Sequence, residues 1–250
     1  MPTFIHGKDT KLYINEFDFS DSVTSAETTF TNEPVESTSY GDASKKYVTG
    51  LQSTTLSVSG FWAGGSNEID EELFAFLGNS TSQVITAKLG TSAIGGRAII
   101  MQADEMSYGI SNPVSDLVSV SADFTANTKA TTDLTLAAQA GVQLTLGASI
   151  AHGSLGSLSS VDNSASSANG GFGILHVPTN TVNGNTTIKI QHSANDASWA
   201  DLASYTADGS SATTSELKAV SGTVNRYLRA TASTAGSSGS ITFMVSFARF

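Results

Sequence analysis

Alternation of apolar and polar residues dominates this chain and predicts a protein built of β-strands. Residues 52–62 present an apolar face and a hydroxyl face. The apolar face holds Leu56, Val58, Gly60 and Trp62, and the other holds Ser53, Thr55, Ser57 and Ser59. A period of two with one apolar and one polar face is typical of a half-buried strand. This stretch is therefore expected to cover a core with one face only.

Residues 117–127 show the same pattern most clearly. Val118, Val120, Ala122 and Phe124 alternate with Ser119, Ser121, Asp123 and Thr125. Further strands are expected at residues 11–17, 23–31, 83–89, 97–110 and 132–136. In the last third of the chain they are expected at residues 172–177, 187–191, 202–205, 224–230 and 241–247, with Asn183-Gly184 as a hairpin turn. We expect an all-β fold.

A long polar span lies between the strand that ends near Phe30 and the strand that starts at Gln52. It has few apolar residues and two expected turn points, at Gly41 and Gly50, and Pro34 favours an edge strand or a free loop in its first half. Such an arm cannot bury itself. Because long loops in compact domains are usually functional or disordered, we expect it to dock on another molecule, although an ordinary surface loop is the simpler alternative.

One helix is expected, over residues 68–77. Asn67 is the candidate N-cap, and three acidic residues in the first turns suit the helix dipole. Gly78 is expected to end the helix. The apolar stripe consists of Ile69, Leu73, Phe76 and Leu77. This stripe should pack against the apolar faces of the strands.

The pattern is lost between residues 147 and 173, where Ser, Gly and Ala dominate. Four apolar residues in this span could still add a short strand or two: Ile150, Leu155, Leu158 and Val161. We expect a domain boundary here, with one domain over residues 1–147 and a small antiparallel β-sandwich over residues 148–250.

Composition argues against several classes of function for this chain. The chain of 250 residues carries 12 basic and 22 acidic residues, a net charge of −10, so a basic surface that grips nucleic acid is not expected. It has no cysteine, which excludes disulfides and thiolate metal sites. Residues 1–20 resemble no signal peptide, and no apolar run is long enough for a membrane helix, so neither secretion nor membrane insertion is expected.

The sequence contains no constellation of catalytic or ligand-binding groups typical of an enzyme, and we expect neither a catalytic site, nor a cofactor, nor a metal. His176 and His192 could meet on neighbouring strands, but structural roles are favoured. Asn195 is expected in an Asx turn rather than a calcium site. Trp199 could be a sugar-stacking platform, although a core tryptophan is favoured. Arg226 and Arg229 could bind an anion, with surface ion pairs as the simpler alternative.

The order of these elements resembles a known family. A strand is followed by EPVESTSYGD (residues 33–42), YVTGL (47–51), a strand ending in SGFW (59–62) and a short acidic helix. This resembles the major tail tube protein of long-tailed bacteriophages over about residues 1–147. Residues 188–249 resemble the domain that decorates the outside of many tail tubes.

The resemblance implies two antiparallel sheets plus a helix, joined between subunits into a hexameric β-barrel ring. Rings would stack into a virion tail tube that passes DNA without specific binding. Partners would be tail terminator, tape measure and distal tail proteins, and assembly would take place in the host cytoplasm. The long arm would reach from one ring to the next.

Two sets of residues are then candidates for function. The polar strand face would line the lumen through Glu27, Ser57, Ser119, Ser121 and Asp123. The inter-ring arm would act through Glu33, Glu36, Tyr40, Asp42, Lys45 and Lys46, with opposite charges fixing the register between rings. An ordinary solvated sheet face is the alternative for the first set. The alternative functions are a carbohydrate-binding or adhesive β-protein that uses Trp199 and a capsid decoration protein.

Overall fold

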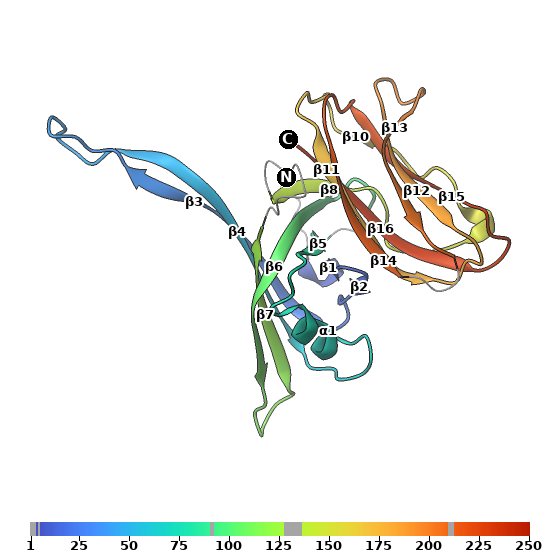
Figure 1. The fold of residues 1–250 in the computed structure, drawn as a ribbon, viewed down its shortest axis with the longest axis horizontal. Helices are drawn as coiled ribbons and strands as arrows, with labels where there is room; N and C mark the ends of the chain where they lie inside the picture. The colour runs from blue at the N-terminus through green and yellow to red at the C-terminus, as the bar shows by residue number, and fades with distance from the viewer. Residues whose placement is uncertain (1–3, 5, 91–92, 128–136, 210–212) are drawn as a thin grey trace.

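The computed structural model describes residues 4, 6–90, 93–127, 137–209 and 213–250 and shows a mostly β protein with one α-helix (Figure 1). This confirms the all-β class with one short helix. The described strands form two open antiparallel sheets, the large sheet and the small sheet. No described helix has the length and apolar composition needed to cross a membrane.

The large sheet contains twelve strands. They are β1 (Lys11–Ile14), β2 (Phe17–Asp18), β3 (Val23–Glu36), β4 (Tyr47–Phe61), β5 (Gln83–Lys88), β6 (Arg97–Ser111), β7 (Ser119–Ala126), β8 (Ala138–Gln143), β9 (Ser149–Ala151), β11 (Gly171–Asn180), β14 (Thr214–Val220) and β16 (Ser240–Arg249). The small sheet consists of β10 (Val161–Asp162), β12 (Thr186–Ser193), β13 (Ala200–Ala207) and β15 (Tyr227–Thr234). The helices are α1 (Ile69–Phe76) and two short 3-10 turns, Gly7–Asp9 and His152–Ser154.

The large sheet branches at β6. Its first half pairs with β5 on one side and with β8 on the other, and its second half pairs with β7. From β7 the sheet continues to β4 and β3, from β5 to β1 and β2, and from β8 to β16, β11 and β14. The long strand β6 therefore joins the arm-bearing part of the sheet to the part formed late in the chain.

Alternation decides which strand faces are buried. Leu56, Val58, Val120, Ala122 and Phe124 are buried on one face of β4 and β7, as the sequence predicts. They pack with the apolar stripe of α1, which covers this face (Figure 1). In contrast, β5 is buried along its whole length, because Ile85 and Ala87 pack in the core that contains α1, whereas Val84 packs on the other face against β11.

The helix departs from its predicted ends. Glu68, not Asn67, is the N-cap residue, because Asn67 adopts a left-handed conformation with φ of 60°. Ile69, Leu73 and Phe76 are buried as predicted, but Leu77 is 41% exposed because the helix ends before it. Gly78 follows with φ of 76°, the left-handed stop that glycine accepts readily.

The predicted turn at Gly50 and the predicted hairpin at Asn183-Gly184 are wrong. Gly50 lies inside β4 at a bulge opposite Glu33, where a Cβ atom would meet the Glu33 carbonyl oxygen at 2.8 Å. Asn183-Gly184 joins no hairpin, because β11 and β12 belong to different sheets. Instead, the Asn183 side chain accepts hydrogen bonds from the backbone N–H groups of Ser237 and Ser238.

Strand β14 was not predicted, because its sequence TSELKAV shows little apolar alternation. Trp62, expected on the apolar face, follows the end of β4 and is 43% exposed. The strand predicted at residues 132–136 lies outside the described residues.

The last third of the chain forms a sandwich. The inner faces of β11 and β16 pack against β12, β13 and β15 around a core that includes Ile188, Tyr205 and Phe247. The span without a clear pattern contributes β9 and β10, and Val161 is buried in this core. The predicted boundary near residue 147 falls within a continuous sheet, since β16 pairs with β8 through Phe247 and Val142.

A buried histidine ties the late strands to the early ones. The Nδ1–H group of His176 on β11 donates to the Asn15 carbonyl oxygen at 2.5 Å, since a carbonyl can only accept. Its Nε2 atom lies 2.8 Å from the Thr86 hydroxyl, and its ring stacks on Tyr13. Burial lowers the pKa of His176 to about 4, so the ring is neutral at pH 7. The expectation of a structural histidine is confirmed, and His192 lies on the other sheet.

Candidate functional site

The candidate site is the polar face of the four adjacent strands β3, β4, β7 and β6. Strand register places Glu27, Ser57, Asp123 and Ser107 in one row across these strands. All four side chains are exposed. A second row consists of Ser25, Ser59, Ser121 and Gly109, and Ser119 follows opposite Phe61. The alternation of β4 and β7 thus forms a continuous surface rich in hydroxyl groups.

Asp123 is the hydrogen-bonded centre of this face. The Ser57 hydroxyl donates to one carboxylate oxygen at 2.7 Å, and the Ser107 hydroxyl donates to the other at 2.8 Å. These two hydrogen bonds lower the pKa of Asp123 from its usual value. Asp123 is therefore ionised at neutral pH and remains on the surface as a fixed negative charge.

The electrostatics of the face follow directly from the sequence. None of the residues of β3, β4 and β7, nor residues 104–111 of β6, is lysine or arginine. Glu27 and Asp123 place two carboxylates in the first row, with one serine between them. A surface of hydroxyls and carboxylates without basic groups repels phosphate groups rather than binding them.

Both outer edges of this four-stranded part are open. Among the described residues, β3 pairs only with β4, and residues 105–111 of β6 pair only with β7. The unpaired backbone groups of such edges can pair with another chain. Pro34, near the far end of β3, agrees with the predicted edge position.

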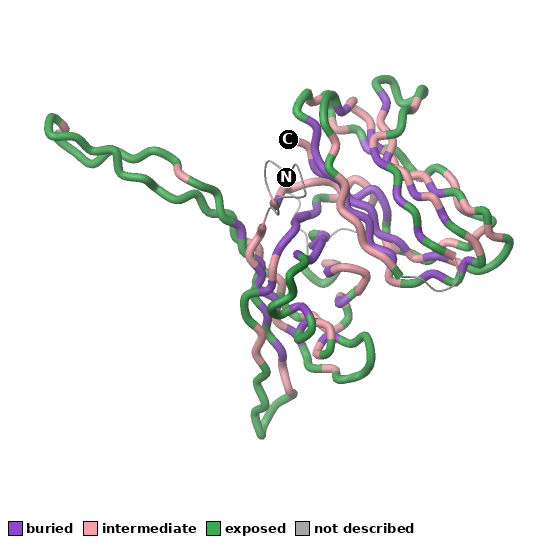
Figure 2. Tube along the Cα trace, in the orientation of Figure 1, coloured by how far each residue is buried: buried purple, intermediate pink, exposed green. Residues whose placement is uncertain are grey.

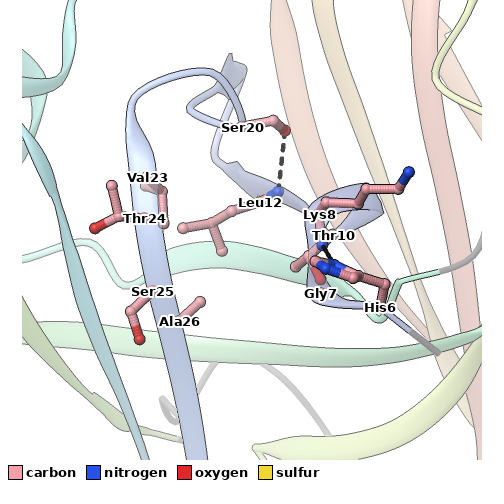
Figure 3. Close-up of a pocket in the computed structure, with 10 residues that line it drawn as sticks. All are labelled: His6, Gly7, Lys8, Thr10, Leu12, Ser20, Val23, Thr24, Ser25 and Ala26. Carbon is pink, nitrogen blue, oxygen red and sulfur yellow. Dashed lines mark hydrogen bonds between the residues drawn. The ribbon is translucent and has the colours of Figure 1, made fainter. Parts of the chain in front are cut away.

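A groove runs beside the start of β3. It measures about 520 Å³, and Val23, Thr24, Ser25 and Ala26 form one wall (Figure 3). The opposite wall comes from His6, Gly7, Lys8 and Thr10, with Leu12 and Ser20 between the walls. The open edge of β3 thus begins beside this groove.

The predicted arm is a hairpin that extends away from the rest of the molecule (Figures 1 and 2). Strands β3 and β4 pair as far as Glu36 and Tyr47, and no residue from Thr29 to Ser53 is buried. Residues 37–46 form the tip, and Tyr40 there is fully exposed. Between Thr29 and Ser53 the arm has no buried residue, and among the described strands its two strands pair there only with each other.

The charges of the arm pair within the hairpin. Lys45 lies 3.2 Å from Glu36, and Lys46 pairs with Asp42. The Lys46 ammonium group, together with hydrogen bonds from Ser39, lowers the pKa of Asp42. Glu33 is exposed on β3. The structure thus brings four of the six predicted arm residues into two local ion pairs.

The second candidate region, around Trp199, lies on the sandwich. Trp199 is half-buried and lies outside the core, so the expectation of a core tryptophan is wrong. The Arg229 guanidinium lies 4.1 Å from the centre of its ring and donates to Gln191. Arg226 forms a two-point ion pair with Asp162, as the surface-pair alternative predicts.

The Asx turn at Asn195 is confirmed, since its side chain accepts hydrogen bonds from the backbone N–H groups of Ala197 and Ser198. Ser25 and Ser59 lie on the polar face as alternation predicts, although they were not among the predicted lumen residues, and Ser107 could not be predicted. Ser107 follows a bulge that shifts the alternation of β6, so its side chain could not be assigned to a face from the sequence.

Comparison with known proteins finds no matching family model and no matching curated sequence. Loose structural likenesses exist. The tail of a gene transfer agent particle gives 15% identity and a TM-score of 0.38 over 50% of this chain and 95% of that chain. The tube-terminating cap of the anti-feeding prophage gives 14% identity and a TM-score of 0.41 over 51% and 89%.

The Dit protein of phage SPP1, described as a hub of the adsorption apparatus, gives 12% identity and a TM-score of 0.36 over 96% of this chain and 99% of that chain. TM-scores this low describe a loose likeness of shape. The function is therefore argued from the geometry of this chain alone.

Proposed function

We propose that this protein is a structural subunit of a phage tail tube, in which six copies form a ring and rings stack into a conduit for DNA. The observation that carries the proposal is the four-stranded sheet with two open edges and one bare polar face. Its other face is already covered by α1 and the core beneath it. When such sheets join edge to edge, the bare face is the one that remains to face a lumen.

Ring closure would pair β3 of one copy with residues 105–111 of β6 in the next copy. This contact is heterologous, so it closes into a ring when the rotation between copies fits a whole number of subunits. It also removes the exposed edges that make an open sheet prone to aggregation. A chain without cysteine would thereby gain stability from backbone hydrogen bonds between subunits.

The lumen of the ring would carry Glu27, Ser57, Ser119, Ser121 and Asp123. Hydroxyl groups keep this wall hydrated, and the carboxylates repel the DNA backbone, so DNA slides through without specific contacts. The arm would reach the neighbouring ring, and the sandwich would lie on the outer surface. Tail terminator, tape measure and distal tail proteins would be the partners within the virion.

Electron microscopy of the purified protein at rising concentration tests assembly directly. We expect stacked rings with a central hole wide enough for a DNA duplex. Hydrogen–deuterium exchange on the same samples tests the contact. Amides of β3 and of residues 105–111 should become protected in rings, whereas those of β13, an edge strand of the small sheet, should not. Protection of β13 with β3 still exchanging would contradict the proposed ring contact.

The lumen assignment has its own test. Glu27→Lys with Asp123→Lys would place two cations on the polar face, and we expect assembled tubes of this variant to retain duplex DNA at low salt. Asp196→Lys with Asp208→Lys makes the same charge change on exposed loops of the sandwich. Equal DNA retention by the two variants would show that the polar face does not line the lumen.

A further inference from the structure

A small pocket of about 280 Å³ lies where early and late strands meet, away from the polar face and the arm. Gly95, Arg97 and Gly141 contribute to it from the region of β6 and β8. Asn163, Leu228 and Arg249 contribute to it from the sandwich. None of the residues that line it is acidic, although the chain carries a net charge of −10.

Strand register explains why two arginines share this pocket. Arg97 on β6 pairs with Val142 on β8, which pairs with Phe247 on β16. Residues that pair directly across an antiparallel sheet point to the same face, and so does Arg249, two positions after Phe247. Both long side chains therefore extend from one face of the sheet, separated by the width of β8.

These arginines lack the anionic partner that six other cations of this chain have. Lys11, Lys45, Lys46, Lys189, Lys218 and Arg226 each pair with a carboxylate. In the described part of the chain no ion pair involves Arg97 or Arg249. Two cations at one pocket are thus left without a carboxylate in a strongly acidic protein.

Arg249 lies in surroundings that disfavour an unpaired positive charge. Its terminal nitrogens donate to the backbone carbonyls of Ala165, Asn225 and Arg226. Its Nε atom is buried and has no hydrogen-bond partner among the described residues. Burial lowers the pKa of Arg249, which means that the surroundings disfavour its charge. Carbonyl groups hold the guanidinium in place but do not neutralise it.

We propose that this pocket binds a phosphate group between Arg97 and Arg249. Guanidinium groups match phosphate oxygens with paired N–H donors, and a doubly charged anion offsets two arginines at once. The open Arg97 side chain would close over an anion already held near Arg249. The site does not depend on the proposed tube, because both arginines belong to one chain.

Thermal unfolding in a phosphate-free buffer, with phosphate added against sodium chloride of equal ionic strength, tests the proposal. A ligand that binds only the folded state stabilises it, so phosphate at ten times its dissociation constant should raise Tm by about 3 to 6 °C. Arg97→Gln should lose this rise. Lys8→Gln, which removes an exposed cation elsewhere, should keep it. Equal rises in all three proteins would reveal a general salt effect and overturn the site.

Arg97→Glu provides a second, opposite test. Its carboxylate would lie beside Arg249 and replace the anion, so this variant should melt about 1 to 3 °C above Arg97→Gln in chloride and not respond to phosphate. Sodium acetate tests the ligand class. A rise with acetate but not with phosphate, or a wild-type phosphate response in Arg97→Glu, would contradict a phosphate site.

Discussion

The arm and the sandwich use the same secondary structure for opposite purposes. In the sandwich, two sheets cover each other and bury a large apolar core. In the arm, two strands pair over a long distance without burying a single residue from Thr29 to Ser53 (Figure 2). An isolated two-stranded hairpin is at best marginally stable in water. The sandwich therefore supports itself, whereas the arm needs either the strands at its base or another molecule.

The four-stranded polar sheet lies between these extremes. Among the described residues, α1 covers one of its faces, and the other face and both edges are open. Its fold is complete on one side only, and the open side carries the charges and hydroxyls. Substitutions in the packed regions should therefore change mainly the free energy of unfolding, whereas substitutions on the open face and the arm should change mainly assembly.

Truncating a large core side chain should have the largest effect. Phe247 is 1% exposed in the sandwich core, and Phe247→Ala should lower the free energy of unfolding by about 3–5 kcal/mol. Phe30, on the arm, is 41% exposed, and Phe30→Ala should cost less than about 0.5 kcal/mol. Urea denaturation of both variants measures the contrast. Similar losses in the two would show that the arm is part of the stabilising core.

Replacing His176, whose hydrogen bonds link β11 to the early strands, should give the next largest effect on stability, and this effect depends on pH. The folded pKa of about 4 lies below the unfolded value near 6.5, so the contribution of His176 is fully present above pH 6.5 and is lost as the pH falls toward 4. A shift of this size corresponds to about 3 kcal/mol. Urea midpoints between pH 7 and 4 should fall less steeply in His176→Gln than in the wild type. Parallel curves would mean that His176 has the same pKa in the folded and the unfolded protein.

Glu105 should act in the opposite direction. It is 5% exposed against the core under α1, its carboxylate oxygens have no hydrogen-bond partner among the described residues, and burial raises its pKa to about 8. Its contribution is therefore fully present below pH 4.5 and is lost as the pH rises through 8. Glu105→Gln should stabilise the protein by about 2 kcal/mol at pH 6, with no gain at pH 4. A gain that is the same at both values would exclude ionisation as the cause.

These two residues show what the sequence could not predict. Alternation placed Leu56, Val58, Val120 and Phe124 correctly, because a half-buried strand repeats every two residues wherever it lies. His176 and Asn15 are far apart in the sequence, and only the folded sheet brings them together. Glu105 precedes a bulge that no local pattern reveals.

The candidate surface was predicted only in part. Glu27, Ser57 and Asp123 could be assigned to polar strand faces, but their alignment in one row depends on strand register. The open edges of β3 and β6 depend on which strands are neighbours, which alternation does not determine. Gly50 and Asn183-Gly184 were misassigned because glycine marks both turns and close approaches of the backbone, and the sequence does not distinguish them.

Shortening the arm should have the smallest effect on stability. Glu36 and Tyr47 are paired across the hairpin, so residues 37–46 can be replaced by Asn-Gly, the pair favoured in two-residue hairpin loops. Both lysines of the ion pairs lost from the tip are exposed, and ion pairs at the surface contribute little. The free energy of unfolding should change by less than about 0.5 kcal/mol.

The same variant should have a large effect on assembly. If the arm bridges neighbouring rings, microscopy should show single rings where the wild type forms stacks. Lys45→Ala with Lys46→Ala keeps the length of the arm and removes its cations. This variant therefore distinguishes the contribution of the arm's length to stacking from that of its charge. If this variant stacks more weakly, charge on the arm helps to fix the register between rings. If its stacking is unchanged, the length of the arm is sufficient. Full-length tubes after the Asn-Gly replacement would show that the arm, although unsupported by the fold, does not join rings.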